Sequence, residues 1–386
     1  MIRVLVVDDS LVVREIITKI LRSDPEIEIV GTARNGVEAI DLAARLRPSI
    51  ITMDINMPIK NGLEAIEEIM AYTPTPILVI SSLVNKEVGF AFRAMELGAL
   101  DVFEKPTMGV WDGQEKLERE LKAKVKLLSK IRVVTHLAGR RREQKLEGSP
   151  LAETAPLTEN ILNTSLTLPV PEISRKEQTC LLPLPALPQI PPDGLKGSGT
   201  FEIVAIGAST GGPKALQQVL SPIPKDFPLP IVIVQHIADG FTEGLVEWLE
   251  TECMLKIKLG KDRELLQSGV IYVAPCRSHM RVDEYKQIRL DDSAPIGGHK
   301  PAVTALLSSV AKVYGNKAIG VILTGMGGDG AEGLKEMRDK GAATIAQDKN
   351  TSIIFGMPKV AIDMGAAQKV LPIDIIPLEI MRMVGG

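Results

Sequence analysis

The sequence predicts an α/β protein made of two modules, at residues 1–130 and 200–386, each built around a parallel sheet. Short apolar runs alternate with helical periodicity at both ends of the chain, which is the pattern of successive βα units. Between the modules, residues 131–199 are rich in proline, and no Phe, Trp or Tyr lies between Trp111 and Phe201. A stretch with so little large apolar surface cannot form a core, so we predict a flexible or semi-extended linker there.

The composition is that of an ordinary globular protein. The 386 residues are 45% hydrophobic and 24% charged, and this length favours two or three domains. A net charge of −3 and an isoelectric point near 6.0 disfavour a nucleic-acid partner. The three cysteines, Cys180, Cys253 and Cys276, are widely spaced and form no Cys-x-x-Cys pair, so neither a disulfide framework nor a zinc site is indicated.

The N-terminus has none of the features of a signal peptide. The first ten residues, MIRVLVVDDS, place acidic residues directly after a short apolar run, and no later apolar run is long enough to span a bilayer. We therefore expect a cytoplasmic protein that does not insert into a membrane.

The first module contains five predicted βα units. Its predicted strands are IRVLVV, EIEIVGTA, IITM, ILVIS and DVFE; helices are expected near 11–21, 37–46, 63–70, 86–97 and in the stretch that carries Leu117, Leu121, Val125 and Leu128. Such an alternation predicts a doubly wound parallel sheet with helices on both faces. In that architecture, functional residues gather beyond the carboxyl ends of the strands.

Polar residues stand at these strand ends. Asp8 and Asp9 follow the first strand, Asp54 follows the third, Ser81 closes the fourth and Lys105 follows the fifth. Carboxylates gathered on one edge repel one another unless a cation joins them, and oxygen ligands suit Mg²⁺. The lysine and the hydroxyl add a place for an anion, so the set describes a site where a carboxylate accepts a phosphoryl group. Any one of these residues alone is more simply a helix cap or a solvated loop end, but five together favour the site.

The blocks VVDDS, MDINMP, ISS and EKP resemble the signature of bacterial two-component receiver domains, in order, over about residues 1–130. The resemblance implies a flavodoxin-like fold and phosphorylation of Asp54 by a histidine kinase. It implies an Mg²⁺ site made of Asp8, Asp9, Asp54 and the backbone carbonyl of Asn56. It further implies that Ser81 and Lys105 sense the phosphate.

The second module resumes the alternation. Strands are predicted near 201–206, at IVIVQ, at GVIYVAP and at AIGVIL, and MRVDEYKQIRL is a predicted hairpin that turns at Asp283-Glu284. Helices are expected after Ser209, near 241–249, near 301–314 and near Ala331. Ser209, His236 and Asp329 each follow a predicted parallel strand, so we expect them at one edge of the sheet.

Ser209 lies in a Gly-x-Ser-x-Gly turn, Gly207 to Gly211, followed by Pro213 in the first turn of a predicted helix. Such a strand-to-helix turn lifts a hydroxyl out of the sheet and aims free helix amides at it. We interpret Ser209 as a nucleophile. The turn by itself is equally compatible with a phosphate-binding loop, which is the commoner use of glycine-rich βα turns.

A serine, a histidine and an aspartate together suit acyl transfer, because the serine needs a base and the base needs a carboxylate to fix its tautomer. We assign Ser209 as nucleophile, His236 as general acid and base, and Asp329 as its orienting partner. The chain order differs from that of the α/β-hydrolases, so the triad would stand on another fold. Backbone amides near Met326 are candidates for an oxyanion hole.

Each assignment has an alternative. His279 and His299 are rival bases, and His136 lies in or near the linker. Asp329 would also suit the cap of the helix near Ala331. Nucleotide binding is disfavoured, because the spacing is not Gly-x-Gly-x-x-Gly and no acidic residue ends the next strand.

The blocks IGASTGGP, VQHI, YVAP, LTGMGGDGAEGL and GMPKVA resemble the catalytic domain of the chemotaxis protein-glutamate methylesterases, over residues 201–386. The resemblance implies a Rossmann-like fold, a triad of Ser209, His236 and Asp329, and an oxyanion contact from the Met326 backbone. It implies that the substrates are methylated glutamates on chemoreceptors, with methanol as product, no cofactor for the ester chemistry and, in some members, deamidation of receptor glutamines. It also implies that the unphosphorylated receiver packs over the active-site edge.

The chain departs from the family pattern at several positions. Ala302 and Thr304 occupy the serine and aspartate positions of the family block HxPSVD, and Ala238-Asp239 follows His236 where Pro-Pro is common. We expect these changes to spare the triad and to affect substrate contacts. The rival function is a receiver-controlled anion-binding module without esterase activity. A transcription factor is a more distant alternative, since no helix-turn-helix with a basic face is evident.

Overall fold

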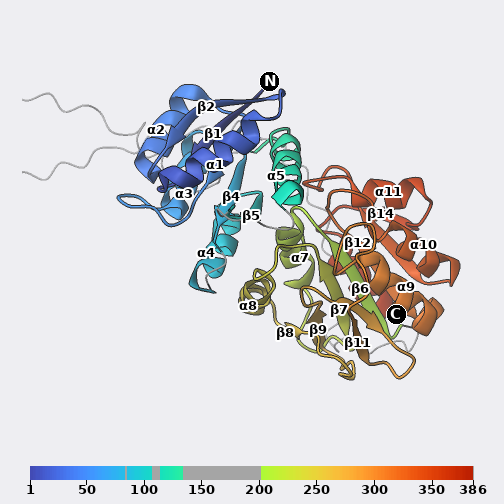
Figure 1. Cartoon of the computed structure of the whole chain (residues 1–386). Helices are drawn as coiled ribbons and strands as arrows, with labels where there is room; N and C mark the ends of the chain where they lie inside the picture. Colours follow the sequence, from blue (N-terminus) through green and yellow to red (C-terminus); the bar gives the residue numbers. More distant parts are fainter. Residues whose placement is uncertain (83–84, 107–113, 134–200, 386) are drawn as a thin grey trace, which may run out of the picture.

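The computed structural model describes residues 1–82, 85–106, 114–133 and 201–385, which form two α/β modules (Figure 1). The N-terminal module has a parallel sheet in the strand order β2-β1-β3-β4-β5. The order of the chain is β1 (Ile2–Val7), α1 (Leu11–Arg22), β2 (Ile27–Ala33), α2 (Gly36–Leu46), β3 (Ile50–Met53), α3 (Gly62–Tyr72), β4 (Ile77–Ser81), α4 (Asn85–Glu96), β5 (Asp101–Glu104) and α5 (Gln114–Leu128). This confirms the predicted doubly wound, flavodoxin-like fold.

Helices of the N-terminal module begin at side chains that satisfy their free amides. Ser10 caps α1, and Asn35 caps α2 by accepting from the Glu38 amide at 2.9 Å. Asn61 and Glu64 form a capping box at the start of α3. These caps order the loops that follow β1, β2 and β3, and the first and third of these loops carry Asp8, Asp9 and Asp54.

The C-terminal module has a seven-stranded, fully parallel sheet in the order β14-β13-β12-β6-β7-β9-β8, and this confirms the Rossmann-like fold. Its elements are β6 (Ile203–Ala208), α7 (Gly212–Leu220), β7 (Ile231–Gln235), α8 (Thr242–Glu252), β8 (Lys256–Leu259), β9 (Val270–Val273), β10 (His279–Val282), β11 (Ile288–Asp291), α9 (Val303–Tyr314), η1 (Gly315–Lys317), β12 (Ala318–Ile322), α10 (Ala331–Asp339), β13 (Ala343–Gln347), α11 (Met357–Asp363), β14 (Lys369–Leu371) and α12 (Ile376–Gly385). Strands β10 and β11 form the predicted antiparallel hairpin.

Two layers of helices bury the central strands of this sheet. Helices α7, α8 and α12 pack on one face, against Val204 and Ile206 of β6. Helices α9, α10 and α11 pack on the other face, against Ile203 and Ala205 of the same strand. Alternate residues of one strand thus enter different cores, which is why the central strands read as continuous apolar runs.

The strand that precedes Ser209 differs from its prediction. It begins at Ile203 and ends at Ala208, so Gly207 lies inside the strand and not in the turn. Gly207 is needed there because a Cβ atom would approach Val303 Cγ1 of α9 to 2.1 Å. Only Gly211 of the two motif glycines has a left-handed backbone, with φ of 74°.

The sequence also predicted a linker between the modules and no membrane-spanning helix. From residue 134 onward, the predicted linker lies outside the described residues, together with His136 and Cys180. Within the described ranges, no helix combines the length and the apolar character that a bilayer crossing requires.

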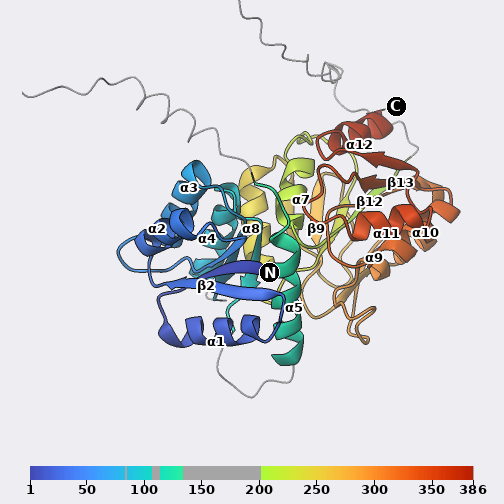
Figure 2. The ribbon, with the colours of Figure 1, turned by 90° about the horizontal axis from the view of Figure 1, so that it is seen from above.

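The two modules contact each other through α4 and α8 (Figures 1 and 2). The Phe92 and Trp248 rings stack with centroids 5.4 Å apart, and Trp248 Nε1 donates a hydrogen bond to Glu96 Oε1 at 2.8 Å. Helix α5 lies on the side of the N-terminal module that faces the C-terminal module in both views. Ile354, from the segment between β13 and α11, is 6% exposed and packs in the same apolar cluster as Leu121 of α5.

Candidate active site

Ser209, His236 and Asp329 lie at one edge of the C-terminal sheet, as expected. Strand β6 pairs with β7 on one side and with β12 on the other. The strands that follow β6 in the chain are first added on the β7 side and later on the β12 side, so the strand order reverses at β6. Ser209 and His236 directly follow β6 and β7, and the His236 amide donates to Ala208 O at 3.0 Å. Crevices at such switch points are the usual binding sites of open α/β sheets.

The turn at Ser209 has the predicted strand-to-helix form. Gly211 is the N-cap of α7, Pro213 stands in its first turn, and Ser209 is 8% exposed. The Ser209 amide is already occupied, since it donates to Thr324 O at 3.0 Å. Its own N–H is therefore engaged with protein, and an oxyanion must be bound by other amides.

His236 and Asp329 form a buried pair. His236 Nε2 lies 2.9 Å from Asp329 Oδ2, and the two side chains are 11% and 5% exposed. With Nε2 facing the carboxylate, the other ring nitrogen, Nδ1, is buried and has no hydrogen-bond partner among the described residues. No hydrogen bond joins Ser209 Oγ to His236 in the described part of the chain. The geometry therefore holds one ring nitrogen of His236 against the Asp329 carboxylate and leaves the other without a partner among the described residues.

Asp329 is a helix cap as well as the partner of His236. Its carboxylate accepts the Val303 amide at 2.7 Å and the Thr304 amide at 3.0 Å, both in the first turn of α9. Burial by itself would raise the Asp329 pKa, but the hydrogen bonds from His236 and Thr304 outweigh it and hold that pKa below the usual range. The suggested cap of the helix at Ala331 is wrong, because α10 has Gly330 as its N-cap and no side-chain cap.

The rival histidines have other contacts. His279 is fully buried, and both ring nitrogens are engaged: Nδ1 accepts from the Ala302 amide at 3.1 Å and Nε2 lies 3.2 Å from Ala294 O. A histidine held in this way has no lone pair to offer a substrate. His299 stacks on His236 with ring centroids 4.0 Å apart and planes within 1°.

The loop after β12 passes directly against Ser209. A Cβ atom on Gly325 would lie 2.7 Å from Ser209 Cβ, so only glycine fits there. Met326 follows, with a side chain in solvent contact at 39% exposure, and its amide has no acceptor among the described residues. The Met326 N–H is thus available next to the serine, as an oxyanion donor must be.

Three residues that depart from the family pattern, Ala302, Thr304 and Asp239, have defined contacts in the structure. Ala302 is the N-cap of α9 and has no side-chain oxygen; the carboxylate of Asp329 occupies that capping position. The hydroxyl of Thr304 accepts the Gly330 amide at 2.8 Å, which ties α9 to the loop of Asp329. Asp239 forms an ion pair with Arg277 at 2.6 Å.

Two residues with no predicted role, Gln235 and Thr324, also stabilise this edge of the sheet. Gln235 and Thr324 are 4% and 1% exposed, and both make hydrogen bonds to the serine turn. The available signal was a polar residue at the end of an otherwise apolar strand, as in IVIVQ.

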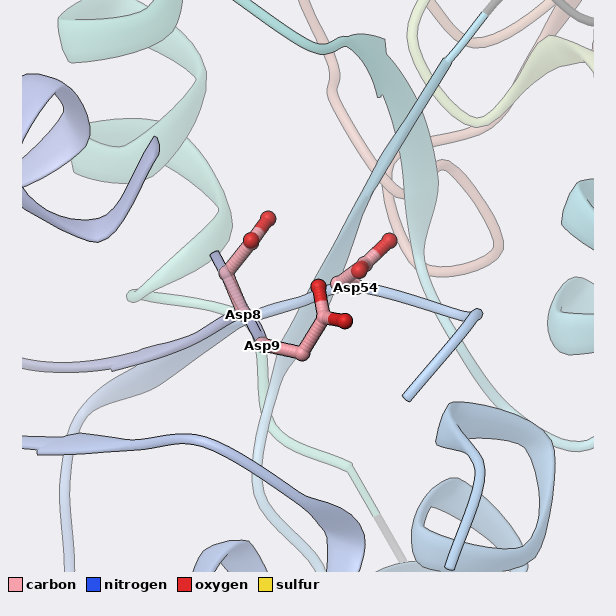
Figure 3. A group of neighbouring side chains, drawn as sticks. All are labelled: Asp8, Asp9 and Asp54. Carbon is pink, nitrogen blue, oxygen red and sulfur yellow. The ribbon is translucent and has the colours of Figure 1, made fainter. Parts of the chain in front are cut away.

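The polar residues of the N-terminal sheet also come together. Ligand oxygens of Asp8, Asp9 and Asp54 lie within 4.8 Å of one another, and Figure 3 shows the three side chains side by side at the ends of β1 and β3. Lys105 Nζ is 3.0 Å from both Asp8 Oδ2 and Asp54 Oδ2. Burial is the main reason that the pKa of Asp54 rises to about 6, and Lys105 opposes this rise.

This acidic group suits a hard divalent cation. The Oδ2 atoms of Asp8 and Asp54 are buried, and the Lys105 ammonium lies 3.0 Å from each of them. Clustered carboxylate oxygens are the ligands that Mg²⁺ prefers in proteins. Asn56 is exposed two residues after Asp54, and Ser81 is buried at the end of β4.

Comparisons with known proteins agree with both modules. Residues 204–380 match the family model described as CheB methylesterase, and residues 4–110 match the response regulator receiver domain. The chain is 41% identical, over 100% of its length and 99% of the relative, to protein-glutamate methylesterase/protein-glutamine glutaminase 1 of Syntrophus aciditrophicus. It is 39% identical, over 100% of its length and 97% of the relative, to the protein of that name from Nitrosospira multiformis. The crystal structure of the Thermotoga maritima CheB methylesterase catalytic domain is 41% identical and covers 48% of this chain and 99% of its own, with a TM-score of 0.46.

Proposed function

The chain belongs to the CheB methylesterase family with an N-terminal receiver domain, and we propose that it is a phosphorylation-regulated protein-glutamate methylesterase. It hydrolyses glutamate γ-methyl esters on chemoreceptors to glutamate and methanol. The relatives also carry the name protein-glutamine glutaminase, so the same site is proposed to deamidate receptor glutamines. The observation that carries the proposal is the buried His236–Asp329 pair on the strand end beside Ser209.

The proposed reaction begins at Ser209. Its Oγ attacks the ester carbonyl while its proton passes to His236 Nδ1, the ring nitrogen that Asp329 leaves free. The Met326 amide donates to the oxyanion, an interaction of a kind that typically contributes about 2.7–4 kcal/mol to transition-state stabilisation. His236 then gives its proton to the departing methoxide, and methanol leaves an acyl-enzyme.

Water completes the cycle. The water oxygen attacks the acyl carbonyl while His236 accepts a proton from that water. His236 then returns the proton to Ser209 Oγ as glutamate is released. A glutamine side chain would follow the same course with ammonia as the leaving group. These steps use only side chains and backbone amides of the C-terminal module.

Substitution of Ser209 tests the catalytic assignment. We expect Ser209→Ala to lower methanol release from methylated receptors by at least 1,000-fold, because the covalent step is lost. A serine-reactive phosphonate should label the parent chain at Ser209 and label His236→Ala much more slowly. Unchanged methanol release by Ser209→Ala would remove the assignment and favour the anion-binding alternative.

The receiver supplies the proposed switch. Asp8, Asp9, Asp54 and the carbonyl of Asn56 would hold Mg²⁺, which neutralises phosphoryl oxygens when bound. Asp54 accepts the phosphoryl group from a histidine kinase, and Lys105, already 3.0 Å from its carboxylate, pairs with the new charge. The Ser81 hydroxyl is proposed to contact the phosphoryl group on Asp54.

Regulation is proposed to act through docking of the receiver on the C-terminal module. The stacked Phe92 and Trp248 join the modules, and Ile354 packs with the receiver while its neighbour Ile353 contacts Gly211 of the serine turn. Phosphorylation that weakens this docking by the usual 1–3 kcal/mol would raise activity about 5- to 150-fold.

A variant of the contact tests this regulation. We expect Trp248→Ala to raise methanol release by the unphosphorylated full chain and to reduce its stimulation by a phosphodonor, because the stack and its hydrogen bond to Glu96 are lost. Trp248→Phe, which keeps a ring, should have a smaller effect. Two results together would exclude inhibitory docking. The first is a Trp248→Ala chain with the basal rate and the stimulation of the parent, and the second is a fragment beginning near Gly199 that is no more active than the unphosphorylated full chain.

A further inference from the structure

Two buried side chains bracket the turn that carries Ser209, one from each neighbouring strand end. On the β7 side, Gln235 Nε2 donates to Ser209 O at 2.7 Å and to His236 O at 2.8 Å. One amide therefore ties the loop of the proposed nucleophile to the loop of the proposed base.

On the β12 side, Thr324 holds the same turn. Its hydroxyl donates to Thr210 O at 3.0 Å and accepts from the Ile354 amide at 2.9 Å. Its carbonyl accepts the Ser209 amide at 3.0 Å, and its own amide donates to Gln347 Oε1 at 2.7 Å. Every polar group of Thr324 is thus engaged, and three of these bonds lead to the serine turn or to the segment packed against it.

Close packing also confines the turn of Ser209, so the turn cannot move without breaking its hydrogen bonds to Gln235 and Thr324. A Cβ atom on Gly212 would lie 1.9 Å from Gln235 Oε1, so the Gln235 side chain lies directly on the start of α7. On the other side, a Cβ atom on Gly325, the residue after Thr324, would lie 2.7 Å from Ser209 Cβ. The serine turn is confined from both sides by side chains that are almost fully buried.

We propose that Gln235 and Thr324 are positioning residues of the hydrolysis reaction, which fix Ser209 relative to His236 and the Met326 amide. The inference rests on the proposed role of Ser209. Neither side chain reaches substrate, because they are 4% and 1% exposed beneath the turn. Their effect is on the placement of the reacting groups, where a displacement of about 1 Å costs on the order of 100-fold in rate.

A buried threonine elsewhere in the same sheet provides a matched control. Thr344 is also 1% exposed, and its hydroxyl donates to Ala366 O at 2.8 Å and accepts the Gln368 amide at 3.0 Å. It repeats the bonding of Thr324 but stands at the start of β13, at the edge of the sheet away from Ser209. Removing the hydroxyl should therefore cost a similar amount of stability at Thr324 and at Thr344.

The test compares Thr324→Val, Thr324→Ser and Thr344→Val in the full chain. Urea unfolding gives stability, methanol release from methylated receptor gives kcat and KM, and a phosphonate probe gives the reactivity of Ser209. We expect Thr324→Val to lower kcat and the labelling rate by about 10- to 100-fold with KM within about twofold of the parent. Thr324→Ser should recover most of the rate, and Thr344→Val should lose similar stability but keep kcat within about twofold.

Gln235→Met provides the second variant, since it keeps the length of the side chain and removes both donors. We expect Gln235→Met to lower kcat by the same factor. If Thr324→Val does not fold, the kcat of Gln235→Met tests the positioning role. Parent kcat in the folded variants, with Ser209→Ala inactive, would overturn the positioning role and leave the proposed function intact. An active Ser209→Ala would remove both.

Discussion

Asp329 shows how one side chain serves both the fold and the chemistry. It accepts two amides of α9 and one ring nitrogen of His236, so a single buried carboxylate fixes a helix and a proposed base. The hydrogen bonds that cap the helix also hold the carboxylate ionised, and an ionised carboxylate is what the imidazolium needs during acyl transfer. The sequence allowed Asp329 to cap a helix as well as to orient a base; the helix that it caps is α9 and not the expected one near Ala331.

Asp329→Asn should therefore affect both stability and activity. At pH 7 we expect the C-terminal module to lose about 1–3 kcal/mol of unfolding free energy and kcat to fall by at least 100-fold because the tautomer of His236 is no longer fixed. The native pKa of Asp329 lies below its unfolded value, so the stabilisation is complete above about pH 4 and is lost as the pH falls toward the native pKa.

The stability difference between the parent and Asp329→Asn should accordingly be constant from pH 5 to pH 8 and shrink in more acidic solution. Urea unfolding across this range measures it. Asp363→Asn serves as a control, because Asp363 is exposed in its ion pair with Lys359 and should cost less than about 1 kcal/mol. A difference that persisted undiminished at pH 3 would contradict the explanation.

The sequence predicted where Ser209, His236 and Asp329 lie better than it predicted the hydrogen bonds around them. Ser209, His236 and Asp329 could be placed at one edge because each follows a buried strand, and the edge is as expected. The bonds of Gln235 and Thr324 were not predictable, because they depend on which backbone carbonyls lie opposite them in the folded sheet. Their catalytic roles, like those of the triad, remain predictions.

At the scale of elements, the strand ends determine where chemistry is possible. Periodicity predicted the five strands of the first sheet, strands β6, β7, β9 and β12 of the second, and the β10–β11 hairpin, because these runs are apolar and flanked by turns. Three strands of the second sheet were not predicted, namely β8, β13 and β14: β8 reads KIKL with exposed lysine at its start, β13 reads ATIAQ, and β14 has only three residues. An edge strand that faces solvent carries little hydrophobic signal.

The loop after β12 allows a sharp test of how closely elements must approach. In Gly325→Ala, the added methyl group would meet Met357 Sδ at 2.3 Å and Ser209 Cβ at 2.7 Å, so the loop or the serine turn must shift. We expect a loss of about 1–3 kcal/mol of stability and at least a tenfold lower kcat for methanol release.

Gly328→Ala in the same loop is the matched control. Its nearest neighbour would be Val360 Cγ1 at 3.1 Å, a contact that a small side-chain movement relieves. Its kcat should stay within about threefold of the parent. Equal losses in the two variants would mean that the loop responds to added bulk in general and not to its approach to Ser209.

For the whole molecule, the contact between modules links the proposed switch to the proposed active site. Lys105 faces the phosphoacceptor, and the residue before it, Glu104, interacts electrostatically with Asp239, three residues after His236. Asp239 also forms an ion pair with Arg277. The like charges of Glu104 and Asp239 still raise the Glu104 pKa, so they oppose the docking of the modules that the Phe92–Trp248 stack favours.

The sign of the pH effect follows from the Glu104 carboxyl. Burial raises the pKa of Glu104 above the usual range, and the Asp239 carboxylate raises it further. Because Asp239 belongs to the other module, its contribution is present only when the modules are docked, so the docked form binds a proton more tightly than the separated form does. Docking should weaken as the pH rises through the interval between these two pKa values. Glu104→Gln, which is neutral at every pH, should dock more firmly at neutral pH.

We therefore expect unphosphorylated Glu104→Gln to release methanol about twofold to fivefold more slowly than the parent at pH 7.5, the range for one partly exposed charge pair. The ratio of the two rates cancels the pH dependence of the chemistry itself, and it should approach one as the pH falls toward the carboxyl range. Glu67→Gln on α3, exposed and equal in charge change, should give a ratio near one throughout. A faster Glu104→Gln enzyme would show that Glu104 favours docking, contrary to the repulsion inferred here.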